Sequence, residues 1–424
     1  MERGVMSSKI SETPAAELPL RPHVLFFLVY NALYFIPLMV AYVVGYEEGG
    51  VGDVLLLRSS TLRQIWWIYL AGISAFLAGS FLPSFLSWCI KGKSPAIPKS
   101  RWLKIGVAEK TAMLILCVVF LASKVSLIPL GVYHAYAFDT DSMTGGLWSF
   151  SMFCSEAMVL AGIVVLFSKE RRRLLGFLAI STLNGINLLH GTRIFFMSTV
   201  MVLVLYGYVR GKLTLRRIVL YGPVLFAFVL LIAYAIFLSR SAAAVNGATS
   251  FAAIVSPVVY ESVFSQMSLI GILDSARLWA TFGQPLHFVS DLIVFAMPRF
   301  LLPDKDSALY IARFSNLSPL GAFSGYAQGL IYFGVLFPVF YFVMGYVGSY
   351  LHKKSGRSPW WFGLYIFFTA DFLLHIMRDG YLIPLKMLIN TVELVLILVV
   401  WKNIVSASLP QPVVTPPKPS QIGV

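Results

Sequence analysis

The sequence is poor in charge and in cysteine, and each shortage excludes a class of protein. Asp, Glu, Lys and Arg make up 12% of the 424 residues, whereas hydrophobic residues make up 58% and the mean hydropathy is +0.80. Soluble domains carry about 25% charged residues, so this composition excludes an ordinary soluble protein. Cys89, Cys117 and Cys154 lie in separate apolar runs without CxxC spacing, which excludes a disulfide scaffold and a zinc site.

The N-terminal segment lacks the features of a cleavable signal peptide. The stretch MERGVMSSKISETPAAELPL contains no apolar core, so we expect it to stay on the chain and the first spanning helix to act as signal anchor. Clustered metal ligands are lacking too. The six histidines are dispersed, and DTD (Asp139–Asp141) is too short a motif to indicate a metal site. We therefore expect chemistry without a metal or another cofactor.

Long apolar runs, in contrast, are abundant. Two of the runs, near Leu174 and Ile194, are short and are joined by HGTR (His190–Arg193); read as one interrupted helix, they would reverse the topology of everything after them. The sequence predicts an all-α polytopic membrane protein with about ten transmembrane helices. Their expected starts are near Val24, Ile65, Val107, Leu147, Leu174, Ile194, Val219, Ser324, Trp360 and Tyr381.

The distribution of positive charge favours ten separate helices and sets their orientation. With the N-terminus inside, the segments KGKSPAIPKSRWLK, KERRR, RGKLTLRR and HKKSGR all face the cytoplasm, as the positive-inside rule requires. Both termini are then cytoplasmic, and Arg193 faces outward. The net charge of +14 follows from this arrangement, so nucleic acid is not an expected partner, whereas membrane lipids are.

One outer segment is too long to be a simple connection, and we expect it to be a structured helical cap. Within it, Val289–Asp306 has an apolar stretch that is too short to span, which is typical of an interfacial or re-entrant element. The expected parts are a cytoplasmic tail (1–22), helices one to seven (23–239), the cap (240–323), helices eight to ten (324–404) and a disordered, Pro-rich cytoplasmic tail (405–424).

Cations gather on the outer side, where the positive-inside rule makes them rare. Any single one can anchor a helix end by snorkelling to headgroups. Several together favour an anionic ligand, because a guanidinium binds phosphate through two charge-assisted hydrogen bonds. Diphosphate is the natural candidate for a lipid-embedded enzyme. The outer cations that we consider are Arg193, Arg240, Arg299, Arg313, Arg378 and Lys305.

Ionisable residues also lie within the last two apolar runs. Asp371, His375 and Arg378 are spaced by four and three residues, which places them on one helix face. We expect Asp371 to form an ion pair with Lys386 of the next helix. A general base for a sugar hydroxyl must lie outward and near the arginines. The candidates are His190, Glu261, His287, Asp291, Asp304, Asp306 and Asp379.

Four stretches of the chain resemble a known family. They are GTR (Gly191–Arg193), MPRFLLPDKD (Met297–Asp306), GYAQGLIYFGVLFPVFYFVMGYVGSYL (Gly325–Leu351) and RDGYL (Arg378–Leu382). In order and topology they look like the Wzy-type O-antigen polymerases, over about residues 174–400. The resemblance implies a GT-C-like glycosyltransferase of the bacterial inner membrane with a large periplasmic loop. Its reaction in lipopolysaccharide biosynthesis transfers a glycan from undecaprenyl diphosphate to another undecaprenyl-diphosphate-linked repeat unit.

The resemblance also suggests roles for residues and partners. The family's outward arginines fall on Arg193, Arg299 and Arg378, with Lys305 beside them. The implied partners are undecaprenyl-diphosphate-linked oligosaccharides and a separate membrane protein that regulates chain length. Our candidate catalytic residues are Arg193, Arg299, Arg378, Asp304 and Glu261, and our candidate substrate-binding residues are Lys305, Arg240, Arg313, His190 and His375.

Two alternatives stay open at this point. An O-antigen ligase uses the same donor and would be expected to depend on a histidine in the cap, where this sequence has His287. A lipid-linked oligosaccharide flippase or transporter is supported by the helix number and by the buried charges of the last two helices. The two halves of the chain show no evident inverted repeat, which argues against a transporter.

Overall fold

The computed structural model describes thirteen stretches of the chain. They are residues 21–44, 59–91, 105–127, 142–189, 194–209, 213, 217, 220, 265–275, 283–297, 301–302, 305–317 and 323–408. In these stretches the regular elements are helices, which confirms the expected all-α class. Four helical stretches are long and apolar enough to cross a membrane: Pro22–Val40, Ser60–Pro83, Gly325–Ser355 and Trp360–Asp379. The number of ten spans stays a prediction, and the seventh expected span lies outside the described residues.

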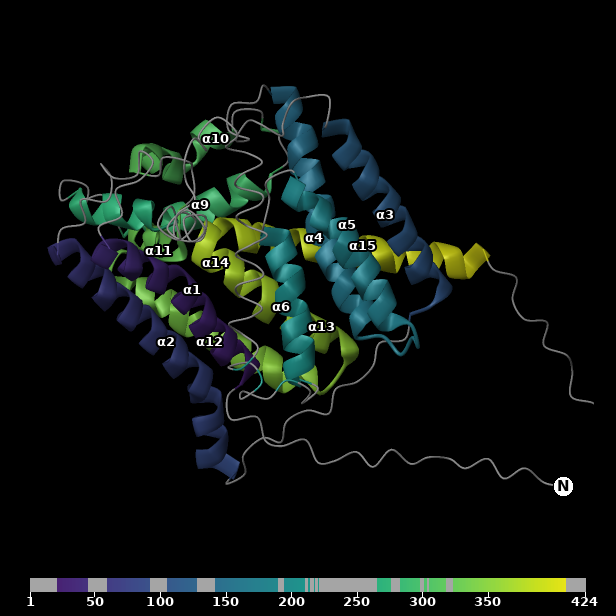
Figure 1. Cartoon of the computed structure of the whole chain (residues 1–424), viewed down its shortest axis with the longest axis horizontal. Helices are drawn as coiled ribbons and strands as arrows, with labels where there is room; N and C mark the ends of the chain where they lie inside the picture. The colour runs from purple at the N-terminus through teal and green to yellow at the C-terminus, as the bar shows by residue number, and fades with distance from the viewer. Residues whose placement is uncertain are drawn as a thin grey trace, which may run out of the picture.

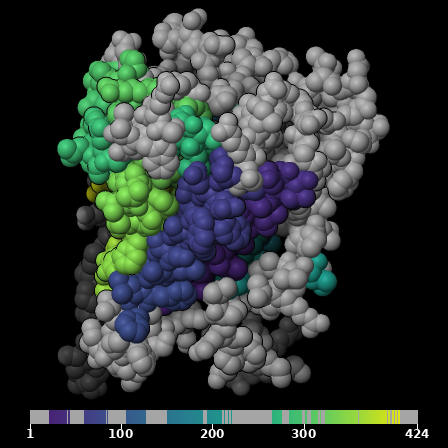
Figure 2. All heavy atoms as spheres, turned by 90° about the vertical axis from the view of Figure 1, so that its left-hand side faces the viewer, coloured from purple at the N-terminus to yellow at the C-terminus, as the bar shows by residue number. Residues whose placement is uncertain are grey.

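Helices α1 (Pro22–Val44), α2 (Ser59–Lys91) and α12 (Phe337–Ser355) pack together at one side of the molecule. Figure 2 shows α2 in blue between α1 in purple and α12 in light green. At the seam of α2 and α12, a Cβ on Gly79 would meet the Phe342 carbonyl, and one on Gly345 would meet the Phe76 carbonyl. Glycine is therefore required at both positions, as in other membrane helix pairs whose backbones touch.

A second group of helices contains α3 (Val107–Leu127), α4 (Ser142–Leu166), α5 (Arg173–Leu189) and α6 (Ile194–Val209). The Asn184 side chain of α5 donates to Phe195 O and to Thr199 Oγ1 of α6, over 3.3 and 3.0 Å. Fifteen residues of continuous helix would separate positions 184 and 199 by about 22 Å. The two short runs therefore form a hairpin of two helices rather than one interrupted helix.

Helix α11 (Gly325–Phe333) folds back on α12. The Tyr326 and Tyr341 rings stack with centroids 4.8 Å apart, although a straight helix would place these positions about 22 Å apart. The reversal occurs at the 3-10 turn η4 (Gly334–Leu336), where Gly334 has a φ of 54° that favours glycine. The apolar run that starts near Ser324 is thus a short helix and a long one, packed antiparallel.

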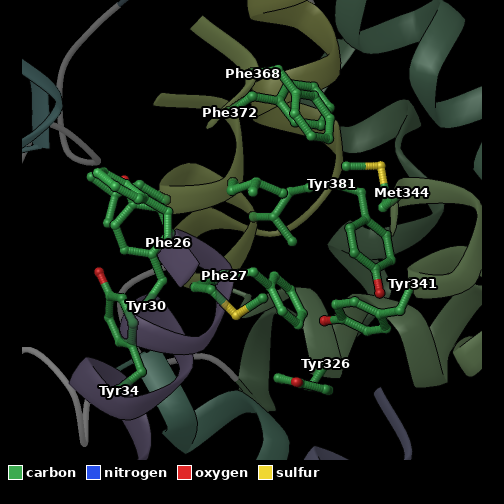
Figure 3. Packing of buried hydrophobic residues seen from close by; sticks show 14 of the residues in the cluster. Phe26, Phe27, Tyr30, Tyr34, Tyr326, Tyr341, Met344, Phe368, Phe372 and Tyr381 are labelled. Atoms are coloured by element: carbon green, nitrogen blue, oxygen red, sulfur yellow. The ribbon is translucent and has the colours of Figure 1, made fainter. Parts of the chain in front are cut away.

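The last part of the chain is a broken helix followed by a long one. It comprises α13 (Pro359–Phe367), a π-helical turn η5 (Phe368–Phe372), α14 (Leu373–Asp379) and α15 (Leu382–Ser408). Phe368 and Phe372 of the η5 turn belong to the same hydrophobic core as Tyr30 of α1, Tyr326 of α11 and Tyr341 of α12, which Figure 3 shows from close by. Figure 1 places α14 near the centre of the fold.

Described parts of the expected cap lie across the end of the bundle at which α14 finishes (Figure 1). They include α9 (Pro285–Ala296), α10 (Lys305–Ala308) and the 3-10 helix η3 (Tyr310–Leu317). The Asp291 carboxylate of α9 accepts hydrogen bonds from Tyr310 N and Ile311 N, at 2.7 and 3.0 Å, and from Tyr332 Oη of α11 at 2.6 Å. One buried carboxylate therefore joins α9, η3 and α11.

Candidate functional site

Three ionisable side chains form a row along η5 and α14. His375 Nδ1 lies 2.8 Å from Asp379 Oδ2, and His375 Nε2 lies 3.7 Å from Asp371 Oδ1. The exposed fractions of the side chains are 0% for Asp371, 2% for His375 and 12% for Asp379. The row thus runs from the dry interior of the bundle to its partly solvated end.

Arg378 completes the row at the solvated end. Its Nη1 lies 3.4 Å from Asp379 Oδ1, and 27% of its side chain is exposed. A guanidinium is always charged, so this arginine favours the ionised form of the neighbouring carboxylate. The Arg378 and Asp379 charges balance each other at the partly exposed end of the row.

The local structure explains why these side chains meet. The spacing of four residues between Asp371, His375 and Asp379 keeps them on one face of the helix. The π-helical turn η5 carries Asp371 and lies directly before α14. Such turns are rare in helices and occur frequently at functional sites. The η5 turn is held by Tyr30 of α1, whose hydroxyl donates to Ala370 O over 2.9 Å.

Gln328 of α11 fixes the end of α14. Its Oε1 accepts hydrogen bonds from Tyr381 N and Leu382 N, at 2.6 and 3.3 Å, and its Nε2 donates to Asp379 O over 3.4 Å. Gly380 turns the chain with a φ of 77°, and a Cβ there would clash with the Gln328 amide. The RDGYL stretch therefore needs its glycine for both conformation and space.

Helix α6 borders the row on another side. The Phe195 ring contacts the His375 ring, with centroids 5.9 Å apart. The Ser198 hydroxyl lies beside the Asp371 carboxylate without completing a hydrogen bond. The first turn of α6 directly follows the HGTR stretch in the sequence. The structure thus brings the beginning of α6 against His375, three residues before the RDGYL stretch.

The interior end of the row contains polar atoms without hydrogen-bond partners. They are both carboxylate oxygens of Asp371, Nε2 of His375 and Oγ of Ser198. Most buried polar atoms in proteins have a partner, because an unpaired one loses its hydration without compensation. The cluster of such atoms around Asp371 therefore marks a place where a proton, an ion or a water can bind.

The structure describes only some of the site residues that the sequence predicts. His375 and Arg378 belong to the row. Arg313 of η3 is exposed, and its guanidinium lies 5.4 Å from the centroid of the Tyr310 ring. Lys305 begins α10. The remaining ones lie outside the described residues: Arg193, Arg240, Arg299, Asp304, Glu261 and His190.

Two predictions about single residues need correction. The expected Asp371–Lys386 ion pair is wrong, because α15 turns Lys386 toward α9, where its Nζ lies 4.9 Å from the centroid of the Phe295 ring. Asp291, a candidate general base, is 1% exposed and holds two backbone amides and a tyrosine hydroxyl. These donors leave it no freedom to take a substrate proton.

Two other residues of this region are accounted for by packing. The His287 ring stacks on Tyr310, with centroids 4.1 Å apart and an interplanar angle of 8°. Burial raises the pKa of the Tyr310 hydroxyl above its ordinary value, so this ring is neutral. His287, Tyr310 and Arg313 thus form a stack at the surface of the cap.

Sequence reasoning missed a polar network between α4, α5 and α6. Asn187 Nδ2 donates to Asn184 O over 3.0 Å, and the Ser155 hydroxyl of α4 donates to Asn187 Oδ1 over 2.9 Å. Glu156, the next residue, accepts from Asn390 Nδ2 of α15 over 3.4 Å. The signal for this network was the pair of asparagines in NGIN, inside an otherwise apolar run.

Comparisons with known proteins found no relative of the chain. No protein-family model, no curated protein and no solved structure matches it. The resemblance to the Wzy-type polymerases therefore stays an expectation. Among the described residues, no group of three or more His, Cys, Asp or Glu side chains has the arrangement of a metal site. The expectation of chemistry without a metal likewise stays a prediction.

Proposed function

We propose that the protein is a membrane glycosyltransferase that polymerises lipid-linked oligosaccharide repeat units. The observation that carries the proposal is the row of Asp371, His375, Asp379 and Arg378, which ends at a partly exposed arginine side chain at one end of a candidate spanning helix. A cation beside a carboxylate–imidazole pair suits a transfer between a sugar hydroxyl and a diphosphate donor, because the pair can accept the proton and the cation can stabilise the leaving group.

The proposed chemistry uses Arg378 and Asp379, the two residues at the exposed end of the row. Arg378 binds the diphosphate, and its charge stabilises the leaving group while the bond from the anomeric carbon to the phosphate oxygen breaks. Asp379, oriented by His375, accepts the proton of the acceptor hydroxyl as that oxygen forms the new glycosidic bond. The diphosphate departs with the electron pair of the broken bond.

The position of α6 supports a shared site for two of the predicted arginines. Phe195 contacts His375, and Arg193 precedes Phe195 by two residues in the sequence. We propose that Arg193 joins Arg378 at the diphosphate and that Arg299 and Lys305 of the cap complete the binding site. Asp304 and Glu261 remain candidates for a second acid or base.

The proposal extends to the surroundings of the enzyme. The bundle would be the GT-C-like, ten-span protein expected from the sequence, placed in a bacterial inner membrane with the end of α14 facing the periplasm. The basic stretch at the end of α12, which contains Lys353 and Lys354, would then face the cytoplasm. The partners would be undecaprenyl-diphosphate-linked oligosaccharides and a regulator of chain length.

The decisive experiment replaces Arg378 in protein reconstituted with lipid-linked repeat units. We expect Arg378→Ala to slow chain growth by about 10²–10³-fold, as the loss of a group that stabilises developing charge does. Arg378→Lys should also be impaired, because lysine cannot form the planar bidentate contact. The matched control is Lys353→Ala, which removes an exposed cation near the C-terminal end of α12, away from Arg378. Unchanged chain growth by correctly inserted Arg378→Ala protein would refute the proposal.

A second candidate is a transporter of lipid-linked oligosaccharides. The observation that favours it is the ionisable pair Asp371 and His375 deep inside a candidate spanning helix, since such pairs serve as proton relays in transporters. Sealed vesicles separate the two functions. Translocation of the oligosaccharide without any change in glycan length would support the transporter, whereas longer glycans support the polymerase.

A further inference from the structure

The interior end of the row presents an unusual pairing of two acceptors. A carboxylate only accepts hydrogen bonds, so at 2.8 Å from Asp379 Oδ2 the Nδ1 atom of His375 must carry the hydrogen. In a neutral imidazole the other nitrogen, Nε2, then has a lone pair. It faces Asp371 Oδ1 at 3.7 Å, and both atoms are buried without a hydrogen-bond partner.

Two lone pairs facing each other in a dry interior repel unless a positive charge lies between them. Asp371 and His375 are 0% and 2% exposed, so water does not screen the repulsion. The distance of 3.7 Å exceeds that of a hydrogen bond, which places the two groups apart but within reach of one after a small adjustment. The simplest ligand that satisfies both atoms is one proton.

The charges of the four residues agree with one bound proton. With Asp379 ionised beside Arg378, these two charges cancel. A single proton added to Asp371 and His375 then gives either a neutral acid with a neutral imidazole or a carboxylate with an imidazolium. Both forms have zero net charge for the row. Without that proton, a carboxylate would remain uncompensated in the interior, which is strongly unfavourable.

The groups around the pair offer no other ionised partner for this proton. From α14, Asp379 and Arg378 face His375; from α1, the Tyr30 hydroxyl is near Asp371 but donates to Ala370 O. From α6, Asp371 meets the uncharged Ser198, and from α11, Gln328 is committed to the backbone after Asp379. Among the described residues, His375 is thus the side chain that forms an ion pair with Asp371.

We propose that Asp371 and His375 form an intramembrane binding site for one exchangeable proton, which keeps the interior end of the row neutral during glycosyl transfer. This use of the site rests on the proposed function. The acceptor O–H bond breaks and its proton moves to Asp379 while the glycosidic bond forms. His375 keeps its hydrogen on Nδ1, toward Asp379, and Asp379 passes the acceptor proton to water at the exposed end of the row. The departing diphosphate keeps the electron pair, so no oxidant or reductant is needed.

Infrared spectroscopy of the purified protein in lipid tests the proton site without any substrate. We expect the difference spectrum between low and high pH, recorded in H₂O and D₂O, to contain a protonated-carboxyl band that is lost in Asp371→Asn. The same band should shift in His375→Gln. Asp274→Asn removes an exposed carboxylate elsewhere and should leave the band unchanged. A band that survives in Asp371→Asn would overturn the proposal.

The same measurement separates a proton from a metal cation. The oxygens of Asp371 and Ser198 are also possible ligands for a sodium ion. We therefore expect the Asp371 band to be the same when sodium chloride replaces choline chloride at constant ionic strength. Loss of the band on addition of sodium would overturn the assignment of a proton.

Chain growth tests the contribution of the bound proton. We expect Asp371→Asn to lower kcat by about 10²-fold with little change in KM, because Asp371 positions the imidazole that orients Asp379 and does not touch the diphosphate. If the infrared band is present and neither Asp371→Asn nor Arg378→Ala alters chain growth, the glycosyltransferase proposal fails while the proton site stands. If Arg378→Ala abolishes chain growth and the band is absent, the proton site fails alone.

Discussion

At the scale of single residues, the role of a buried carboxylate follows from the donors that surround it. Asp291 and Asp371 are equally buried, at 1% and 0% exposed. Asp291 accepts three hydrogen bonds, two of them from backbone amides, whereas the oxygens of Asp371 have no hydrogen-bond partner. A satisfied carboxylate stabilises the fold, and an unsatisfied one is available for binding.

Replacing Asp291 should therefore reduce stability. Asp291→Ala leaves the Tyr310 and Ile311 amides and the Tyr332 hydroxyl unpaired, at a cost of about 1–3 kcal/mol for each donor that stays buried. We expect a lower midpoint of thermal unfolding in detergent and faster proteolysis of the cap. Ser290→Ala, the exposed neighbour on α9, is the control and should unfold like the unmodified protein. A midpoint equal to that of the control would contradict this role for Asp291.

The sequence could predict the neighbour of Asp371 but not the hydrogen-bond donors of Asp291. The spacing of four residues predicted that Asp371 and His375 share a helix face, because helical periodicity is a local property. The donors of Asp291 come from residues 19 to 41 positions further along, and sequence spacing carries no information about such contacts. For the same reason Lys386, which is near Asp371 by depth, could not be assigned to the ring of Phe295.

At the scale of helices, backbone contact between α2 and α12 depends on glycine. The Phe76 carbonyl occupies the space that a side chain at position 345 would need, and the Phe342 carbonyl does so at position 79. Close approach of two backbones lets more of their atoms come into van der Waals contact, which drives helix association where the hydrophobic effect is absent. This contact fixes the position of α12. Helix α11 packs against α12, and Gln328 of α11 binds the end of α14.

An alanine at this seam should separate the two helices. We expect Gly345→Ala to destabilise the protein by about 1–3 kcal/mol, the usual cost of overpacking, or to prevent its correct insertion. Gly363→Ala is the matched control, because a Cβ on Gly363 of α13 meets nothing within 4 Å and alanine favours the helix. Thermal unfolding of the two variants in the same detergent makes the comparison. Equal stability of the two proteins would refute the close contact.

Hydropathy predicted some helices correctly and others only in part. For α5 and α6, hydropathy allowed two helices or one interrupted helix, and the distribution of positive charge favoured two. The hydrogen bonds of Asn184 confirm the hairpin. The reversal between α11 and α12 was not predicted, because the residues on both sides of Gly334 are apolar. Hydropathy carries no information about the backbone angle of a single residue. The η5 turn was likewise invisible, because a π turn leaves no clear pattern in one sequence.

At the scale of the whole molecule, the proposed orientation places the cap and the basic end of α12 on opposite sides of the membrane. The positive-inside rule assigns Lys353 and Lys354 to the cytoplasm and α9 to the outside. The number of spans and the larger part of the cap lie beyond what the described residues establish. The sequence therefore predicts the class of the protein better than it predicts the path of its chain.

Labelling of single cysteines checks this orientation. In a protein whose three native cysteines are replaced by alanine, we expect Ser290→Cys on α9 to react with a membrane-impermeant thiol reagent in cells with an opened outer membrane. Lys353→Cys should react only after the inner membrane is permeabilised, because a charged reagent does not cross hydrocarbon. Both positions are exposed, so the reagent reaches either one once it is on the correct side. The opposite pattern would reverse the topology.

The hydrogen bonds between Gln328 and the Asp379–Tyr381 turn also have a consequence for biosynthesis. Gln328 leaves the ribosome about 50 residues before the backbone groups that it binds, and the partner of Tyr326, Asn31, was made almost 300 residues earlier. Helix α11 can thus settle against the first helix during translation, but the polar row takes its final shape only once the last helix has left the translocon. A nascent chain that stalls before that point would be inserted in the membrane without a complete row.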